Sequence, residues 1–195
     1  MNFFDALKTR RSQYSITGTS KISDDEILEI VREGVKHAPS AFNSQTTRAF
    51  VLFGENHDKL WDIVKESLIN KIGEERYANK TAEKIEGFKA GYGTVLYYIN
   101  QNDVQEMADK YTELFHSWSY QSAGMVIGNV WVGLSQAGLG ANLQHYNPLI
   151  DEKVKEAFNV PDGFELIGQM PFGDITEAPS EKEFKDIDEL VKVIK

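Results

Sequence analysis

Two short stretches carry side chains suited to binding an anionic, planar ligand. Near the N-terminus stand Arg10, Arg11 and Ser12, which combine guanidinium forks with a hydroxyl donor and so have the chemistry of an anion clamp. The second stretch is His37–Gln45, in which Pro39 ends a helix and hydroxyl and amide side chains follow. A polar loop between a rigid helix and a strand can fix a planar ligand by hydrogen bonds. Each stretch also has an ordinary interpretation, as a basic helix end or a helix stop.

Helical and extended segments interleave along the chain, and their order predicts an α+β or α/β sandwich. Apolar periodicity and capping residues predict helices after Asn2, over 24–37 behind the capping box Ser23–Glu26, around 60–68 with Asn56 as cap, and over 104–111, 118–137 and 151–158. Strands are expected over 48–54, 93–99 and 164–172, with 141–146 extended and 13–21 forming a loop. The charged segment 70–89 is expected to be an exposed helix or a mobile excursion.

The predicted helix 118–137 is apolar on nearly every side, as in a helix that lies centrally or at an interface. Gly124 and Gly128 are one turn apart on one face, where another backbone could approach closely. We therefore expect this helix to be central and to pack against a second subunit.

Composition excludes several classes of function. The 195 residues suit one domain over 1–195, with 70–90 as a helical excursion. The net charge of -9 argues against a nucleic-acid-binding protein, which would need a clustered basic face. Because cysteine is absent, disulfides, thiolate metal sites and cysteine nucleophiles are excluded. The N-terminus does not read as a signal peptide, and no apolar run approaches the length of a spanning helix, so a cytoplasmic location is expected.

Three motif-like patterns fail on their context. Gly138–Gly140 follows a helix, and Leu143 occupies the third glycine position of a dinucleotide loop. Ser135 lies inside a predicted helix, whereas a nucleophile elbow needs a strand-to-helix turn. Glu113–His116 has the spacing of a carboxylate-bridged metal site but no second copy. No metal site is expected.

Five stretches together resemble the FMN-dependent nitroreductase superfamily, and within it the fatty-acid-repression-mutant-like and copper-induced nitroreductases. They are Arg10–Ser12, Ala38–Gln45, Gly91–Leu96, Gly138–Asn147 and Gln169–Gly173, and the resemblance spans nearly the whole chain. It implies a three-layer α/β sandwich with a central mixed sheet flanked by helices. It also implies an intertwined homodimer with an FMN in each of two interface sites.

The same resemblance implies a set of cofactor-binding residues. Arg10 and Ser12 would hold the phosphate and ribityl chain, with Arg11 beside them, and Lys182 matches a phosphate-binding lysine. The loop that the other subunit places against the flavin matches Pro39, Ser40, Ala41 and Asn43, and the segment that passes flavin N5 matches Leu143, Gln144 and His145.

The chain departs from the family pattern in two places. Phe184 replaces the arginine that normally follows the lysine by two positions, and Tyr14 stands where many members have a basic residue. A polar or basic contact to the pyrimidine edge of the flavin is also expected from the excursion, with Lys84 and Lys89 as candidates.

The resemblance implies an NAD(P)H-dependent oxidoreductase. Hydride would pass from NADH or NADPH through flavin N5 to a nitroaromatic or quinone-like acceptor by ping-pong kinetics, and no catalytic side chain is required. The subgroup resemblance also implies a role in a redox or oxidative stress response. One alternative is a flavin-binding sensor or regulator without turnover. Another is an interaction protein without flavin, in which the Arg10 and Arg11 guanidiniums lie in solvent.

Overall fold

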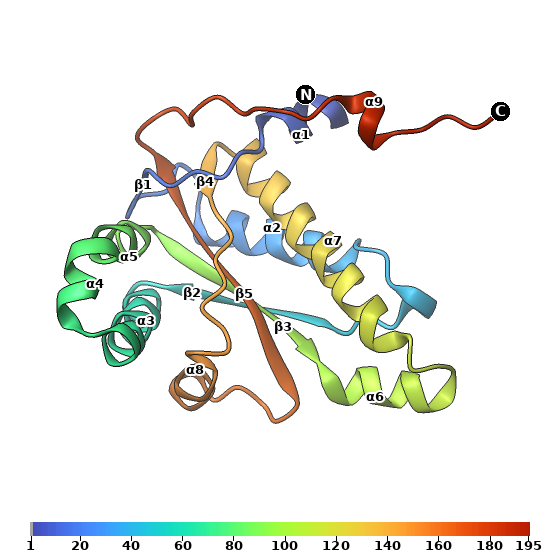
Figure 1. Ribbon diagram of the computed structural model, residues 1–195, viewed down its shortest axis with the longest axis horizontal. Coiled ribbons are helices and arrows are strands. Elements are labelled where there is room, and N and C mark those ends of the chain that lie inside the picture. Colours follow the sequence, from blue (N-terminus) through green and yellow to red (C-terminus); the bar gives the residue numbers. More distant parts are fainter. Residues whose placement is uncertain (1) are drawn as a thin grey trace.

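The computed structural model describes residues 2–195 as a central sheet between two layers of helices (Figure 1). The helices are α1 (Phe3–Thr9), α2 (Asp24–Lys36), α3 (Glu55–Ile72), α4 (Glu74–Lys80), α5 (Ala82–Lys89), α6 (Gln101–Lys110), α7 (Phe115–Gln136), α8 (Asp151–Phe158) and α9 (Ile187–Leu190), with a 3-10 turn, η1 (Ala41–Asn43). The strands are β1 (Ile16–Thr17), β2 (Thr47–Phe53), β3 (Gly93–Asn100), β4 (Leu139–Ala141) and β5 (Phe164–Ile175). This confirms the predicted α+β sandwich.

The sheet has the order β1-β5-β3-β2, and β4 adds to β5. Pairs between these strands are antiparallel, while an isolated bridge joins Ser12 and Ala141 in parallel. Strand β3 is buried at every residue because helices cover both faces of the sheet. Its side chains alternate, so Leu96 and Tyr98 enter one core while Val95 and Tyr97 enter the other.

One face of the sheet is covered by α3, α4, α5 and α8 around the fully buried Trp61. Segment 70–89 lies in this layer, where Tyr77, Ile85 and Phe88 are at most 4 % exposed. The segment is helical and mostly exposed, as expected, but these three side chains attach it to the core. Its few apolar residues are spaced to meet α3, and their burial anchors an otherwise charged segment.

The other face is covered by α2 and α7, which pack closely because glycines remove side chains from their contact. A Cβ on Gly34 would come within 2.7 Å of Val130, and one on Gly133 within 2.6 Å of Ile30. By contrast, a Cβ on Gly124 would meet no atom within 4 Å. Helix α7 is thus central on one side, as predicted, and open on its glycine face.

Local signals placed most element ends well. Asn2 caps α1, and Ser23 forms the predicted capping box at the start of α2. The predicted cap at Asn56 is wrong, because α3 begins at Glu55 behind Gly54, whose φ of 52° turns the chain out of β2. Strand β1 lies inside a segment expected to be a loop.

Over the described residues, no helix combines the length and apolarity needed to cross a bilayer.

Candidate functional site

Four cationic side chains from the two ends of the chain line one cavity of about 480 Å³, and one of them, Lys8, comes from the last turn of α1. Arg10 and Arg11 follow α1, and Lys182 comes from the C-terminal segment, which runs back beside α1 (Figure 1). The Arg11 guanidinium donates to the carbonyl of Ser180 at 2.7 Å and so fixes the approach of this segment. We call Arg10, Arg11 and Lys182 the cation corner.

The cation corner carries positive charge that the described residues do not neutralise. Glu181 also lines the cavity, but no carboxylate within residues 2–195 forms an ion pair with Arg10, Arg11 or Lys182. Burial, and secondarily the neighbouring Arg11, lower the pKa of Arg10. Both arginines are partly buried against protein, which contradicts the interaction-protein alternative that left them in solvent. The corner can therefore accept an anion.

Arg10 lies over an aromatic ring. Its Cζ is 4.5 Å from the ring centroid of Trp131 on α7. The indole Nε1 of Trp131 donates to the carbonyl oxygen of Ala141 at 3.1 Å, and the backbone N–H of Gln13 donates to the same oxygen at 2.9 Å. From the sequence alone, Trp131 is one of several aromatic residues that could either fill the core or line a flat apolar pocket. Its spacing of three residues from Gly128 already places it near the open face of α7.

A second cavity of about 850 Å³ adjoins the cation corner, because Arg10 lines both. Ser12, Pro39 and Leu143 also line it, together with the open face of α7. The fold therefore brings Arg10, Ser12 and Leu143 of one chain together. Pro39 of the same chain lies there too, whereas the resemblance implied that the Pro39 loop near the flavin comes from the other subunit. The cavity is wide and mainly apolar beside its cationic end, a combination that suits a planar ring joined to an anionic group.

One wall of this region is an extended edge that continues β4. Gln144 exchanges both backbone hydrogen bonds with Gln169, so it points toward β5. Successive residues of an extended segment alternate in direction, and the backbone groups of Leu143 and His145 therefore point away from the sheet. Ala141, two residues earlier, uses the same outward direction to accept from Gln13. The edge thus presents backbone donors to a ligand in front of it.

The loop that contains Pro39, Ser40, Ala41 and Asn43 is held in an uncommon conformation. Phe42, Asn43 and Gln45 have φ values of 54°, 54° and 47°, which side-chain-bearing residues rarely adopt. Ser40 Oγ accepts from the backbone N–H of Gln45 at 3.0 Å. Tertiary hydrogen bonds must hold such a loop in place.

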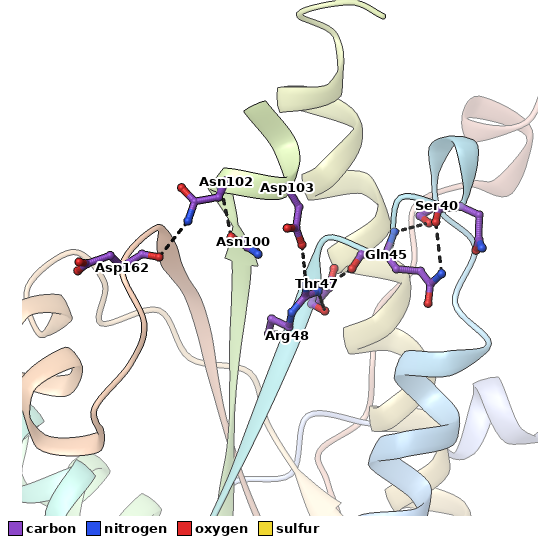
Figure 2. A network of polar contacts seen from close by, with 9 residues as sticks. Ser40, Gln45, Thr47, Arg48, Asn100, Asn102, Asp103 and Asp162 are labelled. Carbon is purple, nitrogen blue, oxygen red and sulfur yellow. Dashed lines mark hydrogen bonds and ion pairs between the residues drawn. The ribbon is translucent and has the colours of Figure 1, made fainter. Parts of the chain in front are cut away.

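Arg48 supplies part of that support (Figure 2). Its guanidinium donates to the carbonyls of Gln45 and Thr47 and forms an ion pair with Asp103 on α6. Ser40, Gln45, Thr47, Arg48 and Asp103 therefore form one connected network, which we call the loop network. A loop fixed in this way is preorganised for contact with a ligand.

The remaining predicted site residues are placed less directly. Pro39, Ser40 and Ala41 line a further cavity of about 380 Å³ beside α7, which Asn43 does not line. The side chain of Gln144 is buried and donates to Asn142 at 2.8 Å, so it can contribute only through its backbone. His145 is exposed at the edge.

The two candidates for a pyrimidine-edge contact differ clearly. Lys84 lines an open cavity of about 810 Å³ together with Tyr14, two residues after Ser12. Lys89 instead pairs with Asp62 at 2.6 Å. Lys89 is thus held by an ion pair, whereas Lys84 lines a cavity that shares no lining residue with the two cavities at Arg10.

The described histidines form no metal site. No group of three or more His, Cys, Asp or Glu side chains within 2–195 could hold a metal ion. His57 is buried, and its Nε2 must carry the proton, because it lies 3.0 Å from the carbonyl of Lys89. Its Nδ1 accordingly accepts from the hydroxyl of Thr94 at 2.9 Å, and that oxygen accepts from Trp61. Both nitrogens are used structurally.

Comparison with known proteins identifies a family. The model of the family described as "Nitroreductase family" matches residues 7–174. The Saccharomyces cerevisiae protein HBN1 is 30% identical over 187 residues, which cover 93% of this chain and 92% of that relative.

Solved structures agree with the family match. The nitroreductase CinD from Lactococcus lactis, in complex with nicotinic acid, is 39% identical, covers 100% of both chains and superposes with a TM-score of 0.92. CinD has also been solved with 4-nitrophenol and with chloramphenicol. A Desulfovibrio desulfuricans structure in complex with FMN shares the fold at 18% identity, with a TM-score of 0.73 over 98% of this chain and 96% of that one.

Proposed function

The chain belongs to the nitroreductase family of flavin-dependent oxidoreductases, and from that premise we propose that it binds FMN and reduces nitroaromatic or quinone-like acceptors at the expense of NADH or NADPH. One observation carries the proposal. Arg10 lies where the cation corner meets the wide cavity, so a single ligand with an anionic end and a planar end fits both.

The described residues suit each part of FMN. Arg10, Arg11 and Lys182 would bind the phosphate, since guanidinium forks match phosphate oxygens and the lysine adds a point charge. Ser12 would donate to the ribityl chain. The outward backbone N–H groups of the 143–145 edge would donate to the ring near N5. Lys84 would reach the pyrimidine edge beside Tyr14.

The chemistry that FMN supplies when bound is two-electron transfer, in which NADH or NADPH is oxidised by loss of hydride and the acceptor is reduced in the same place. The chain's own residues bind, orient and shield the ring, and one shared site gives ping-pong kinetics. CinD binds 4-nitrophenol and chloramphenicol, which supports small nitroaromatic acceptors here. A role in oxidative stress and a cytoplasmic location complete the proposal.

We further propose that residues 1–195 form one domain that acts as a homodimer. The glycine face of α7 is open, and neither Gly124 nor Gly128 would have a neighbour within 4 Å of an added Cβ. A second copy would cover this face, and its loop containing Pro39, Ser40, Ala41 and Asn43 would reach the flavin.

Light scattering after gel filtration tests this: wild type should have twice the chain mass, and Gly128→Arg should shift toward the monomer.

The decisive experiment is the visible absorption spectrum of protein purified without added cofactor, followed by anaerobic addition of NADH or NADPH. We expect a flavin spectrum that bleaches and then recovers when a nitroaromatic or a quinone is added. Absence of flavin even after incubation with FMN would refute the proposed cofactor. A bound flavin that stays oxidised would instead support the sensor alternative.

A further inference from the structure

The two adjacent arginines of the cation corner are held in different ways. Arg11 donates to the Ser180 carbonyl, so part of its fork is already used to fix the C-terminal segment. Arg10 makes no side-chain hydrogen bond or ion pair with any described residue, and its Cζ lies over the ring of Trp131, 4.5 Å from the ring centroid. The indole ring is therefore what positions the Arg10 guanidinium.

An aromatic ring is a particular kind of support, because it offers no hydrogen-bond acceptor to the edge of the guanidinium. All five N–H donors of arginine lie in the plane of the group. A carboxylate partner would occupy that edge and would neutralise the charge, whereas an aromatic face does neither. Arg10 is thus held in place while it keeps the donors and the charge that a phosphate requires.

Trp131 is itself fixed by hydrogen bonding beside the backbone that follows Arg10. Its Nε1 donates to the Ala141 carbonyl oxygen, which also accepts from the N–H of Gln13. Ala141 also forms the parallel bridge with Ser12. The ring therefore has a defined position relative to the backbone of residues 10–13, and so does the guanidinium that lies on it.

We propose that Trp131 is a positioning residue that presents the edge of the Arg10 guanidinium to the phosphate of the cofactor. Trp131 would act on the phosphate through Arg10. Its ring also lines the wide cavity, so the test depends on the difference between a flavin with a phosphate and one without. The inference rests on the proposed function, since it requires that Arg10 binds the phosphate of FMN.

The test compares FMN with riboflavin, which has the same ring and ribityl chain but no phosphate. Apoprotein is titrated with each ligand, and binding is followed by quenching of flavin fluorescence. Trp131→Leu removes the ring, and we expect the Kd of FMN to rise about tenfold while that of riboflavin stays within about twofold. Trp131→Phe keeps a weaker aromatic face and should raise the Kd of FMN about threefold.

The same substitutions are then made together with Arg10→Gln. Because Trp131 acts through Arg10, its loss should no longer change FMN affinity in that background. Equal loss of FMN and riboflavin affinity, or an undiminished effect beside Arg10→Gln, would show a merely structural role and overturn the inference. If Trp131→Leu does not fold, the Trp131→Phe pair decides by the same criteria.

Failure of the proposed function gives a different result. If wild-type protein binds neither ligand, both the cofactor assignment and the role of Trp131 are refuted. If the wild-type protein binds FMN and riboflavin with equal affinity, a flavin site exists but the protein does not recognise the phosphate of FMN. In that case only the positioning role of Trp131 is refuted. Lys153→Gln, which removes a lysine that pairs with Glu66 elsewhere on the surface, serves as the matched control for lost charge.

Discussion

The loop network and the cation corner use the same residue type in opposite ways. In the loop network, Arg48 donates hydrogen bonds to two backbone carbonyls and forms an ion pair with Asp103 (Figure 2). In the cation corner, Arg10 rests on an indole face and keeps both donors and charge. An arginine whose donors are satisfied within the protein stabilises the fold, whereas one held by an aromatic ring keeps its donors available. The contrast underlies our proposal that Arg10, and not Arg48, binds a ligand.

The largest effect should follow from Arg10→Gln. Loss of a charged fork that faces phosphate should weaken FMN binding about fiftyfold, because hydrogen bonds between charged groups are the strong ones. Riboflavin affinity should stay nearly constant, as should the midpoint of urea unfolding. Fluorescence titration and urea denaturation measure these. A drop in stability as large as the drop in affinity would remove the distinction between the two arginines.

Arg48→Gln should do the reverse. It breaks the ion pair with Asp103 and both carbonyl contacts, and we expect the free energy of unfolding to fall by about 1–2 kcal/mol, since the pair is partly exposed. The ratio of FMN to riboflavin affinity should not change. Urea denaturation of the apoprotein measures the first quantity and fluorescence titration the second. A change in that ratio would mean that the loop network takes part in phosphate binding.

Lys182→Gln should have a smaller effect than Arg10→Gln. Lys182 is exposed and contributes a point charge on a flexible stem, so we expect FMN affinity to fall about fourfold. Its loss should also make the salt dependence of FMN binding shallower. Titration at low and at high ionic strength measures both. An unchanged affinity would place the phosphate at Arg10 and Arg11 alone.

His57 extends the comparison to a buried group whose two nitrogens are both satisfied. Burial lowers its pKa, outweighing the hydrogen bond to the Lys89 carbonyl, which raises it. Below the unfolded-state pKa of about 6.5, the unfolded chain binds this proton more readily than the folded one, so stability falls as the pH decreases. His57→Gln should weaken that dependence between pH 7.5 and 5.5 in urea denaturation. Identical pH profiles for variant and wild type would contradict the assignment.

Much of the fold could be predicted because its signals are local. The capping box at Ser23 and the apolar spacing after it specify α2 from adjacent residues alone. The burial of Tyr77, Ile85 and Phe88 on α4 and α5 could not be predicted, because three apolar residues are too few to give a clear periodic face. Only the packing of α4 and α5 against α3 shows that these side chains enter the core.

The candidate site divides in the same way. Arg10, Ser12, Pro39 and Leu143 could be selected by residue type and resemblance, and the fold brings them to one cavity. Other residues selected on the same grounds do not line it: Ser40, Ala41, Asn43, Gln144 and His145. Residue type indicates which chemistry is available, while side-chain direction depends on contacts with other elements.

By itself, the sequence determined the order of the elements, the caps of α1 and α2 and the chemistry of the arginine pair, because each depends on residues close together in the chain. Tertiary structure alone decided that Lys182 lines the same cavity as Arg10 and that the Arg10 guanidinium lies over Trp131. Such contacts join segments far apart in sequence, and they form only when the packing of whole helices and strands sets where each side chain can lie.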